Sequence, residues 1–400
     1  MYKLVKTDRF RIGDVEVSPT SYRMAKSLYR PSTLLLFDQD NFEPVFEVNA
    51  YLLSHAAKER CTDQRSKALL KYFNFLAVNP QLSWNDYAHC SSDNYPPILF
   101  RNKLKQHKDL GNISDTTANA YMGYIKEFYL FCYRHGYIDR EFGLPFTLET
   151  SMYGKHTSNL RIKTYNRNKN LKPISHHHLS MIIMFWSAIC IEIRLAILIT
   201  LFTGMRNKEV ISIPKDILSI PDGFKGVNIT GITISPKLSV NTKLGIERQI
   251  SCPVWLAELL EQYHNSERYR IRCKKYYEEI GELDFPALIN RTGKPYTTQD
   301  LTQQWCNLSR EIRKKGDINF RHKYYDLRAT FGVAKVESLS KVNKLSFHQI
   351  RAILQQEMGH TKSTTTDLYL EHWELNPAIV QHTAMMEDLV SEALKQGVLD

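Results

Sequence analysis

The segment from 155 to 172 divides this chain of 400 residues into two parts of different character. Its basic residues are not interrupted by any acidic residue, and its four asparagines favour turns over regular structure. This composition is typical of a linker between domains. The linker is either only a solvated hinge or also a contact with phosphate groups. The basic residues are Lys155, Arg161, Lys163, Arg167, Lys169 and Lys172.

The part before this linker has a helical pattern over residues 46–154. Apolar residues recur at helical spacing in 68–76 and again in 121–131. We therefore expect a compact helical bundle with its aromatic side chains in the core. Residues 1–45 alternate apolar and polar side chains in places, which predicts a strand or two with a hairpin. This N-terminal extension either packs on the helices or forms an arm.

The part after the linker, residues 173–400, combines helices with two short β stretches. The stretches 227–234 and 248–251 are β-branched and flank a turn at Lys243. A last helix after Pro377 has one apolar stripe, which either packs on its own domain or docks on a neighbouring copy. The expected fold class is mainly α with a small β-sheet: a helical domain followed by an α+β domain.

Charge and cysteine content limit the partners and the compartment. The formal charge is +11, from 53 basic and 42 acidic residues, and it favours a nucleic-acid partner over a basic protein without one. The seven cysteines are scattered without metal-ligand spacing, so we expect reduced thiols in a cytoplasmic protein. We expect no signal peptide and no membrane association, because no apolar run reaches the ~18 residues of a span.

The run His176-His177-His178 suggests metal binding by composition. These histidines open a predicted helix, on which consecutive residues point to different faces. We therefore favour a structural role for the run over a metal site. The sequence predicts neither a metal nor a cofactor.

Five residues of the second part occur in an order that suits phosphoryl transfer without a metal. Taken singly, each has a plain structural explanation, such as a helical ion pair, a solvated turn lysine or a half-buried aromatic ring. Together they supply all the groups that such a reaction needs. In chain order they are Arg206, Lys243, Arg328, His360 and Tyr369.

The chemistry explains why each residue type is needed. Attack on a phosphodiester puts extra negative charge on the non-bridging oxygens, and arginine is always charged and bidentate toward phosphate. Two arginines can therefore take the place of a metal ion. A lysine can protonate the leaving oxygen, because its pKa falls readily near other cations. A tyrosine can be the nucleophile through a covalent intermediate, which keeps the bond energy for religation.

The sequence around these residues resembles the tyrosine recombinase (phage integrase) family, which shares its catalytic fold with type IB topoisomerases. The resemblance covers roughly residues 45 to 385 and depends on five motifs in the family's order. At one position the chain departs from the family pattern: Tyr325 stands where histidine is usual, and tyrosine is a poor base near neutral pH. The matching residues are Thr203-Gly204-Met205-Arg206 with Glu209, Thr242-Lys243-Leu244-Gly245 with Arg248, Tyr325 to Thr330, Met358-Gly359-His360, and Tyr369.

The resemblance implies a role for each matching residue. The two arginines would clamp the scissile phosphate, the lysine would be the general acid and the last tyrosine the nucleophile. The histidine and Tyr325 would support the phosphate, and the glutamate would orient the site. The implied catalytic set is Arg206, Lys243, Tyr325, Arg328, His360 and Tyr369, with Glu209 in support.

The resemblance also implies an activity and its partners. The protein would be a site-specific recombinase that cuts and rejoins double-stranded DNA through a 3′-phosphotyrosyl intermediate, to integrate or excise a mobile element. Residues 46–154 would be the core-binding (SAM-like) DNA-binding domain, and residues 173–400 the catalytic domain with its tail helix. The chain would be a monomer or dimer when free and a homotetramer on synapsed DNA near the nucleoid, aided by accessory directionality or DNA-bending proteins.

Two alternatives stay open. One is a DNA-binding protein of the same fold whose catalysis is weak or lost, for which the tyrosine at position 325 is the reason. The other is a topoisomerase-like enzyme that relaxes DNA without choosing a sequence. The separate helical domain and the tail with its apolar stripe argue against the second alternative.

Overall fold

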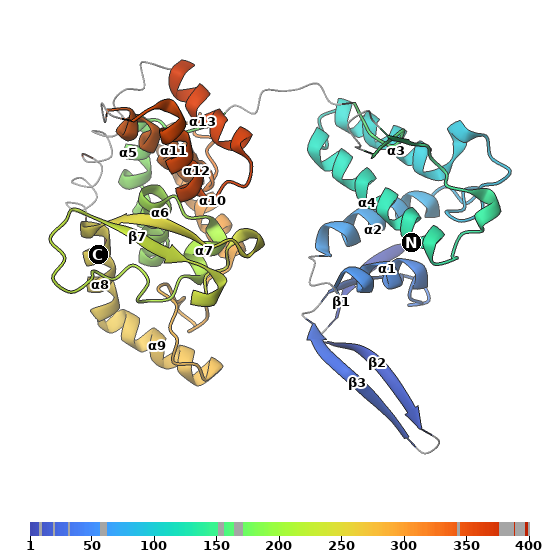
Figure 1. Cartoon of the computed structure of the whole chain (residues 1–400), viewed down its shortest axis with the longest axis horizontal. Coiled ribbons are helices and arrows are strands. Elements are labelled where there is room, and N and C mark those ends of the chain that lie inside the picture. Colours follow the sequence, from blue (N-terminus) through green and yellow to red (C-terminus); the bar gives the residue numbers. More distant parts are fainter. Residues whose placement is uncertain are drawn as a thin grey trace. The chain divides into compact units, whose positions relative to one another are not determined.

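The chain divides into two compact units in the computed structural model, Met1–Arg167 and Asn168–Asp400, and each is described by itself (Figure 1). This division falls inside the segment 155–172, while the finer domain limits remain predictions. The structure describes residues 1–7, 10–18, 21–30, 33–56, 62–150, 156–163, 171–341, 345–375, 388 and 397–398. Within them, no helix has the length and apolar character to span a membrane, and each described cysteine is a free thiol.

Helices with a shared aromatic core make up most of the first unit. They are α1 (Phe46–Ala56), α2 (Asp63–Ala77), α3 (Pro96–Asp109) and α4 (Asp115–Arg134). Helices α2 and α4 supply most of the buried side chains, and the hydroxyls of Tyr72 and Tyr129 share a hydrogen bond of 2.6 Å between them. Ser114 begins α4 by accepting a hydrogen bond from the amide of Thr117. The helical pattern predicted for this part of the sequence is confirmed.

The N-terminal residues of the first unit form strands. Strand β1 (Tyr2–Lys6) pairs antiparallel with β4 (Leu34–Asp38), and this pair packs on the helices. The side chain of Asn49 in α1 both accepts from the amide of Leu36 and donates to its carbonyl, at 2.8 and 2.9 Å. In the stretch of chain that connects β1 to β4, β2 (Phe10–Ser18) and β3 (Ser21–Arg30) form a separate antiparallel hairpin, which the alternating sequence predicted.

In its described residues, the second unit is helical around one two-stranded sheet. Strands β7 (Asn228–Ile234) and β8 (Arg248–Pro253) are antiparallel and flank the turn at Lys243, as predicted. The short pair β5 (Leu148–Thr150) and β6 (His156–Ser158) belongs to the first unit. The described strands thus form four separate two-stranded sheets, of which the sequence predicted the hairpin β2–β3 and the pair β7–β8. The helices are α5 (His176–Met184), α6 (Ile191–Thr203), α7 (Asn207–Ser212), α8 (Val254–Asn265), α9 (Glu267–Ile280), α10 (Thr298–Lys315), α11 (Asp326–Ser340), α12 (Phe347–Met358) and α13 (Ser363–Leu375).

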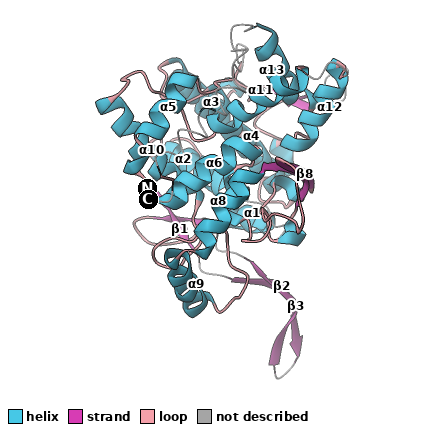
Figure 2. Ribbon diagram, turned by 90° about the vertical axis from the view of Figure 1, so that its left-hand side faces the viewer, coloured by secondary structure: helices cyan, strands magenta, loops and turns pink. Residues whose placement is uncertain are grey.

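Helix α6 runs through the core of the second unit and contacts α8, α11 and β8 (Figure 2). It is apolar on nearly all sides, which is typical of a helix enclosed by others. It ends at Gly204, whose φ of +65° is costly for other residues. A Cβ atom at Gly204 would also lie 2.4 Å from the ring of Phe331 in α11. The two helices therefore approach closely where the motif of Arg206 begins.

Candidate active site

The first arginine of the predicted set stands at the start of α7. Arg206 is the residue before the helix, and its backbone amide donates to Glu209 Oε2 at 2.7 Å. Its guanidinium also contacts Glu209, with 3.0 Å between Nη1 and Oε1. The carboxylate thus satisfies an amide at the helix start and fixes the arginine side chain at the same time.

Glu209 is fully buried and is held by a second arginine from strand β8. Arg248 donates from Nη1 and Nη2 to the two carboxylate oxygens, each over 2.6 Å. Burial alone would raise the pKa of Glu209, but the hydrogen bonds and charges of Arg248 and Arg206 lower it below its ordinary value. Glu209 is therefore ionised at neutral pH, and it links α7 to the strand.

The second predicted arginine, Arg328, comes from the first turn of α11 and is fully buried. It donates to the backbone carbonyls of Gly204 and Met358. Arg206 reaches the same carbonyl of Met358 at 3.0 Å and that of Gly359 at 2.7 Å. The pKa of Arg328 is lowered by burial and then by the charge of Arg206. Two cations from different helices therefore meet at the end of α12.

His360 follows directly after the end of α12. Gly359 makes this turn with a φ of +58°, and a Cβ atom there would lie 2.7 Å from Cδ of Arg248. Nδ1 of His360 is 3.0 Å from Oγ1 of Thr366, which fixes the ring. Burial, followed by the charges of Arg328 and other nearby cations, lowers the pKa of His360 to about 3. The imidazole is therefore neutral at physiological pH.

Tyr369 lies in α13 with only 3% of its surface exposed. Its ring is 5.6 Å from that of His360, between centroids, at an interplanar angle of 31°. The ring covers Gly332 of α11, where a Cβ atom would lie only 2.4 Å from Cε1 of the tyrosine. Burial raises the pKa of Tyr369 to about 12, against the opposing charge of Arg328. The phenol is therefore protonated at neutral pH, and a base is needed to activate it.

The remaining two predicted site residues are more exposed. Lys243 opens the turn between β7 and β8, and its charge contributes to the low pKa of His360. Tyr325 precedes α11 and is 51% exposed. Its hydroxyl acts electrostatically on both Arg328 and Tyr369. The buried part of the set is therefore tightly arranged, with Lys243 and Tyr325 at its solvent-facing edge.

A cavity of about 600 Å³ opens between β8 and α12, beside this set. Arg248, Gly359 and His360 belong to its lining, together with Gln355 and Gln356. The volume is within the range of known ligand sites. The histidine side of the residue set can therefore be reached from solvent.

Two residues that complete the arrangement were missed in the sequence. Thr366 carries no motif, and nothing in the sequence pairs it with His360. Gly332 did leave a signal, because a glycine inside a helical pattern often marks a close packing contact. That signal does not say which side chain makes the contact.

The basic linker residues are only partly described. Arg161, Lys163 and Lys172 are exposed to solvent. Lys155, Arg167 and Lys169 lie outside the described residues, and so does most of the predicted tail helix after Pro377. Among the few described residues of this tail, Val398 is buried in the second unit and its carbonyl accepts a hydrogen bond from Arg194 at 3.3 Å.

No model of a known protein family matches the chain, and no curated protein sequence does. Among solved structures, the chain is similar to XerH site-specific recombinase bound to palindromic difH substrate, at 18% identity over 79% of this chain and 78% of that one, with a TM-score of 0.48. It is similar to a lambda integrase dimer bound to a COC′ core site, at 14% identity over 81% and 76%, with a TM-score of 0.48. It is also similar to the Tn1549 transposon integrase in complex with transposon right end DNA, at 14% identity over 82% and 98%, with a TM-score of 0.48.

Proposed function

We propose that this protein is a site-specific DNA recombinase that cuts and rejoins DNA through a 3′-phosphotyrosyl intermediate, for integration or excision of a mobile element. One observation carries the proposal. Arg206, Arg328, His360 and Tyr369 come from four separate segments of the second unit and gather at the end of α12. Two arginines beside a buried tyrosine and a neutral imidazole are a set of groups that phosphodiester transfer can use.

The arginines would hold the scissile phosphate. Their donors now contact backbone carbonyls of Gly204, Met358 and Gly359. A phosphate oxygen carries a full charge and accepts a stronger hydrogen bond than a carbonyl does. We expect DNA binding to draw part of each guanidinium from these carbonyls to the phosphate. Arg248 would stay on Glu209 and keep Arg206 aligned.

The reaction would need no cofactor. The hydroxyl oxygen of Tyr369 attacks phosphorus, its proton passes to a nearby base, and the bond from phosphorus to the 5′ oxygen breaks. Neutral His360 is adjacent and can hold the phosphate, with Tyr325 as a further donor. It can accept the proton once the negative charge of the bound phosphate offsets the cations that lower its pKa. Lys243 gives its proton to the leaving 5′ oxygen. Religation follows the same steps in reverse.

Double-stranded DNA would be the partner. The formal charge of +11 favours a polyanion, and Arg161, Lys163 and Lys172 present exposed cations close to the division between the units. In the proposed scheme residues 46–154 bind the core site, and four copies act together on synapsed DNA. The protein would work in the cytoplasm, at the nucleoid.

Covalent capture tests the proposal. The wild-type chain and Tyr369→Phe are expressed with DNA from the native locus, the complexes are denatured, and protein-linked DNA is sequenced. We expect adducts only with wild type, because the variant lacks the attacking oxygen but keeps the ring over Gly332. Tyr277→Phe, at an exposed tyrosine of α9, is the matched control and should form adducts. Adducts that persist in Tyr369→Phe would remove this residue from its role.

A DNA-binding protein without useful catalysis is the second candidate. Tyr325 favours it, because this exposed phenol stands where a histidine would be the better proton carrier. Tyr325→His separates the two cases. A large gain in cleavage would mean that the natural site is weakened, and unchanged cleavage would mean that tyrosine is tolerated there. Relaxation of plasmids without any shared site would instead favour a topoisomerase-like activity.

A further inference from the structure

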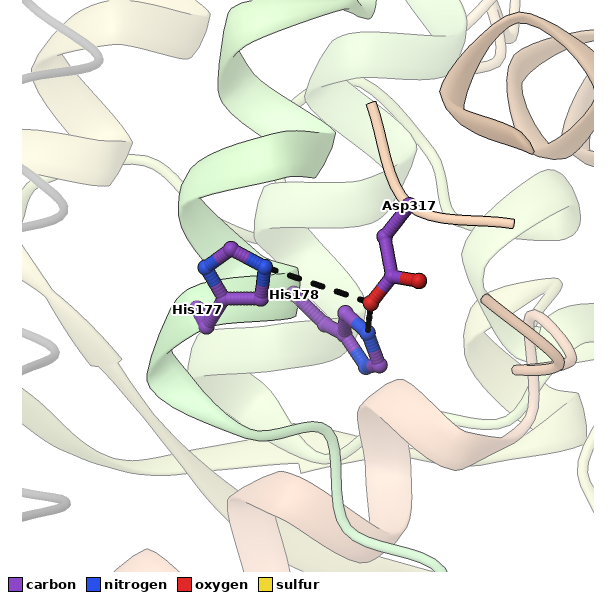
Figure 3. A group of neighbouring side chains, drawn as sticks. All are labelled: His177, His178 and Asp317. Atoms are coloured by element: carbon purple, nitrogen blue, oxygen red, sulfur yellow. Dashed lines mark hydrogen bonds and ion pairs between the residues drawn. The ribbon is translucent and has the colours of Figure 1, made fainter. Parts of the chain in front are cut away.

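Away from the candidate active site, two histidine side chains approach the same oxygen atom of an aspartate. His177 and His178 lie in the first turn of α5, and Asp317 lies between α10 and α11. Figure 3 shows both imidazoles directed at Oδ2 of Asp317. The distance from that oxygen is 2.9 Å to Nε2 of His178 and 4.0 Å to Nε2 of His177. The three donor atoms all lie within 4.8 Å of one another.

A second layer of groups holds two of these side chains in position. Nδ1 of His178 is 2.9 Å from Nε2 of His322, and Nδ1 of His322 is 3.4 Å from Oδ2 of Asp326. Asp317 accepts a hydrogen bond from the amide of Asn319 at 2.7 Å through its other oxygen. The hydrogen bonds from His178 and Asn319 lower the pKa of Asp317, so its carboxylate is ionised.

Both ring nitrogens of His178 have a partner, Oδ2 of Asp317 at 2.9 Å from Nε2 and Nε2 of His322 at 2.9 Å from Nδ1. A metal ion bound to Nε2 would leave Nδ1 free to keep its contact with His322. The ring would therefore be held in place while its other nitrogen binds the ion.

A metal-bound imidazole usually donates its other ring N–H to a neighbouring acceptor, and Nε2 of His322 lies in that position behind His178. In a tetrahedral zinc site with bonds near 2.0 to 2.1 Å, the ligand atoms are about 3.3 Å apart. The distances of 2.9 and 4.0 Å lie on either side of that value. All three atoms lie within 4.8 Å of one another, so side-chain rotations would be needed to bring them to this spacing around one ion.

We propose that His177, His178 and Asp317 form a site for a divalent transition-metal ion, with zinc the best suited of these. Imidazole and carboxylate ligands in this number suit zinc, and water would complete the coordination on the exposed side of His177. The ion would fasten the start of α5 to the connection that leads into α11. His176 lies outside the group, which makes the site a product of the fold and not of the histidine run.

Zinc binding to the purified full-length chain, stripped with a chelator, tests the site. Calorimetry with Zn²⁺ measures affinity, and Co²⁺ absorption identifies the ligands. His177→Ala changes an exposed side chain, while Asp317→Asn keeps an oxygen for the amide of Asn319. We expect each variant to lower zinc affinity by at least roughly tenfold, the loss typical of removing even an outer partner. His176→Ala is the matched control and should bind like wild type.

The outcomes separate a folded site from simpler binding. A cobalt spectrum of nitrogen and oxygen ligands, lost in Asp317→Asn and kept in His176→Ala, supports the proposal. Thiolate-to-cobalt charge transfer would place the ion on a cysteine, such as exposed Cys306, and overturn it. Equal losses in His176→Ala and His177→Ala with no effect of Asp317→Asn would mean chelation by the histidine run, which also overturns it. Absence of micromolar zinc binding has the same consequence. Neither readout depends on DNA cleavage.

Discussion

Two buried glutamates of the second unit, Glu209 and Glu192, have the same kind of ion-pair partners but different neighbours beyond them. Each is fully buried and is held by two arginines. Glu209 binds Arg248 and Arg206 near the candidate active site. Glu192, in the first turn of α6, binds Arg268 and Arg272 of α9, with 2.8 and 2.7 Å between the charged atoms. In both groups, arginine hydrogen bonds and charges outweigh the effect of burial and lower the pKa of the carboxyl.

The difference lies in where the remaining arginine donors point. Arg206 reaches the carbonyls of Met358 and Gly359, beside His360. Arg272 instead donates to the carbonyl of Ile289 and is 8% exposed, so its contacts are internal to the packing of α9. A buried carboxylate with two arginines is thus a structural support in one place and, in the proposed mechanism, a support for reactive groups in the other. The ion pairs by themselves do not distinguish a structural role from a role in the site.

The largest effect is expected from Glu209→Gln. The change removes a buried charge from Arg248 and Arg206, which typically costs roughly 3–5 kcal/mol of stability. It also frees the guanidinium that is proposed to clamp phosphate, and misplacement of such a group costs about 100-fold in rate. Denaturant unfolding and the yield of covalent DNA adduct per folded molecule measure the two effects. If a destabilised Glu209→Gln variant still gave the wild-type adduct yield per folded molecule, Glu209 would support stability alone and would not align the site.

Glu192→Gln should lower stability without lowering the yield of covalent DNA adduct. Removal of this charge leaves Arg272 buried without its partner, so we again expect a loss of roughly 3–5 kcal/mol. Adduct yield per folded molecule should match wild type, because the side chain of Glu192 binds Tyr263, Arg268, Arg272 and Tyr296, which are not residues of the candidate site. The same two assays apply. A fall in adduct yield as large as in Glu209→Gln would mean that both ion pairs serve the site.

Acid should weaken both supports. A carboxyl whose pKa is lowered on folding adds stability above its unfolded pKa of about 4.3. That stability is lost as the pH falls through the lower folded pKa. We therefore expect stability to fall more steeply below about pH 4.3 in wild type than in Glu192→Gln or Glu209→Gln, by about one proton per glutamate. Urea midpoints between pH 3 and 6 (roughly the span in which carboxyls titrate) measure these slopes, and parallel curves would contradict the lowered pKa.

The smallest effect is expected from Arg268→Ala. Its side chain is 43% exposed, so water screens its contact with Glu192, and we expect a loss of about 1 kcal/mol or less. Arg272→Ala, four residues along the same helix and almost fully buried, is the matched comparison and should cost several times more. Thermal unfolding of the two variants ranks them. Equal losses would show that exposure does not decide the strength of these pairs.

Much of the local structure could be predicted from the sequence. Helical spacing in 68–76 and 121–131 predicted α2 and α4, and the β-branched stretches around Lys243 predicted β7 and β8. Such patterns report short-range preferences and the burial of one face, both of which repeat along the chain. The number of strand pairs was underestimated, because the short strands β1, β4, β5 and β6 carry too few residues for a clear alternation.

The candidate site was predictable as a set of residue types in order, but not as an arrangement. Arg206, Arg328, His360 and Tyr369 are far apart in sequence, and only packing brings them to the end of α12. Arg248 matched the basic residue of the motif, but nothing in the sequence indicated its bidentate hydrogen bonds to Glu209. Long-range contacts depend on how helices pack, which local preferences do not encode one residue at a time.

The histidine run shows most clearly what the sequence determines and what only the tertiary structure decides. The sequence by itself determined that three histidines open a helix, and from that placement it favoured a structural role. Only the tertiary structure brought Asp317 to His177 and His178 and placed His322 and Asp326 behind them. These partners come from a connection more than a hundred residues further along the chain. Residue types and local spacing set which chemistry is available, while packing decides which of these groups are close enough to act together.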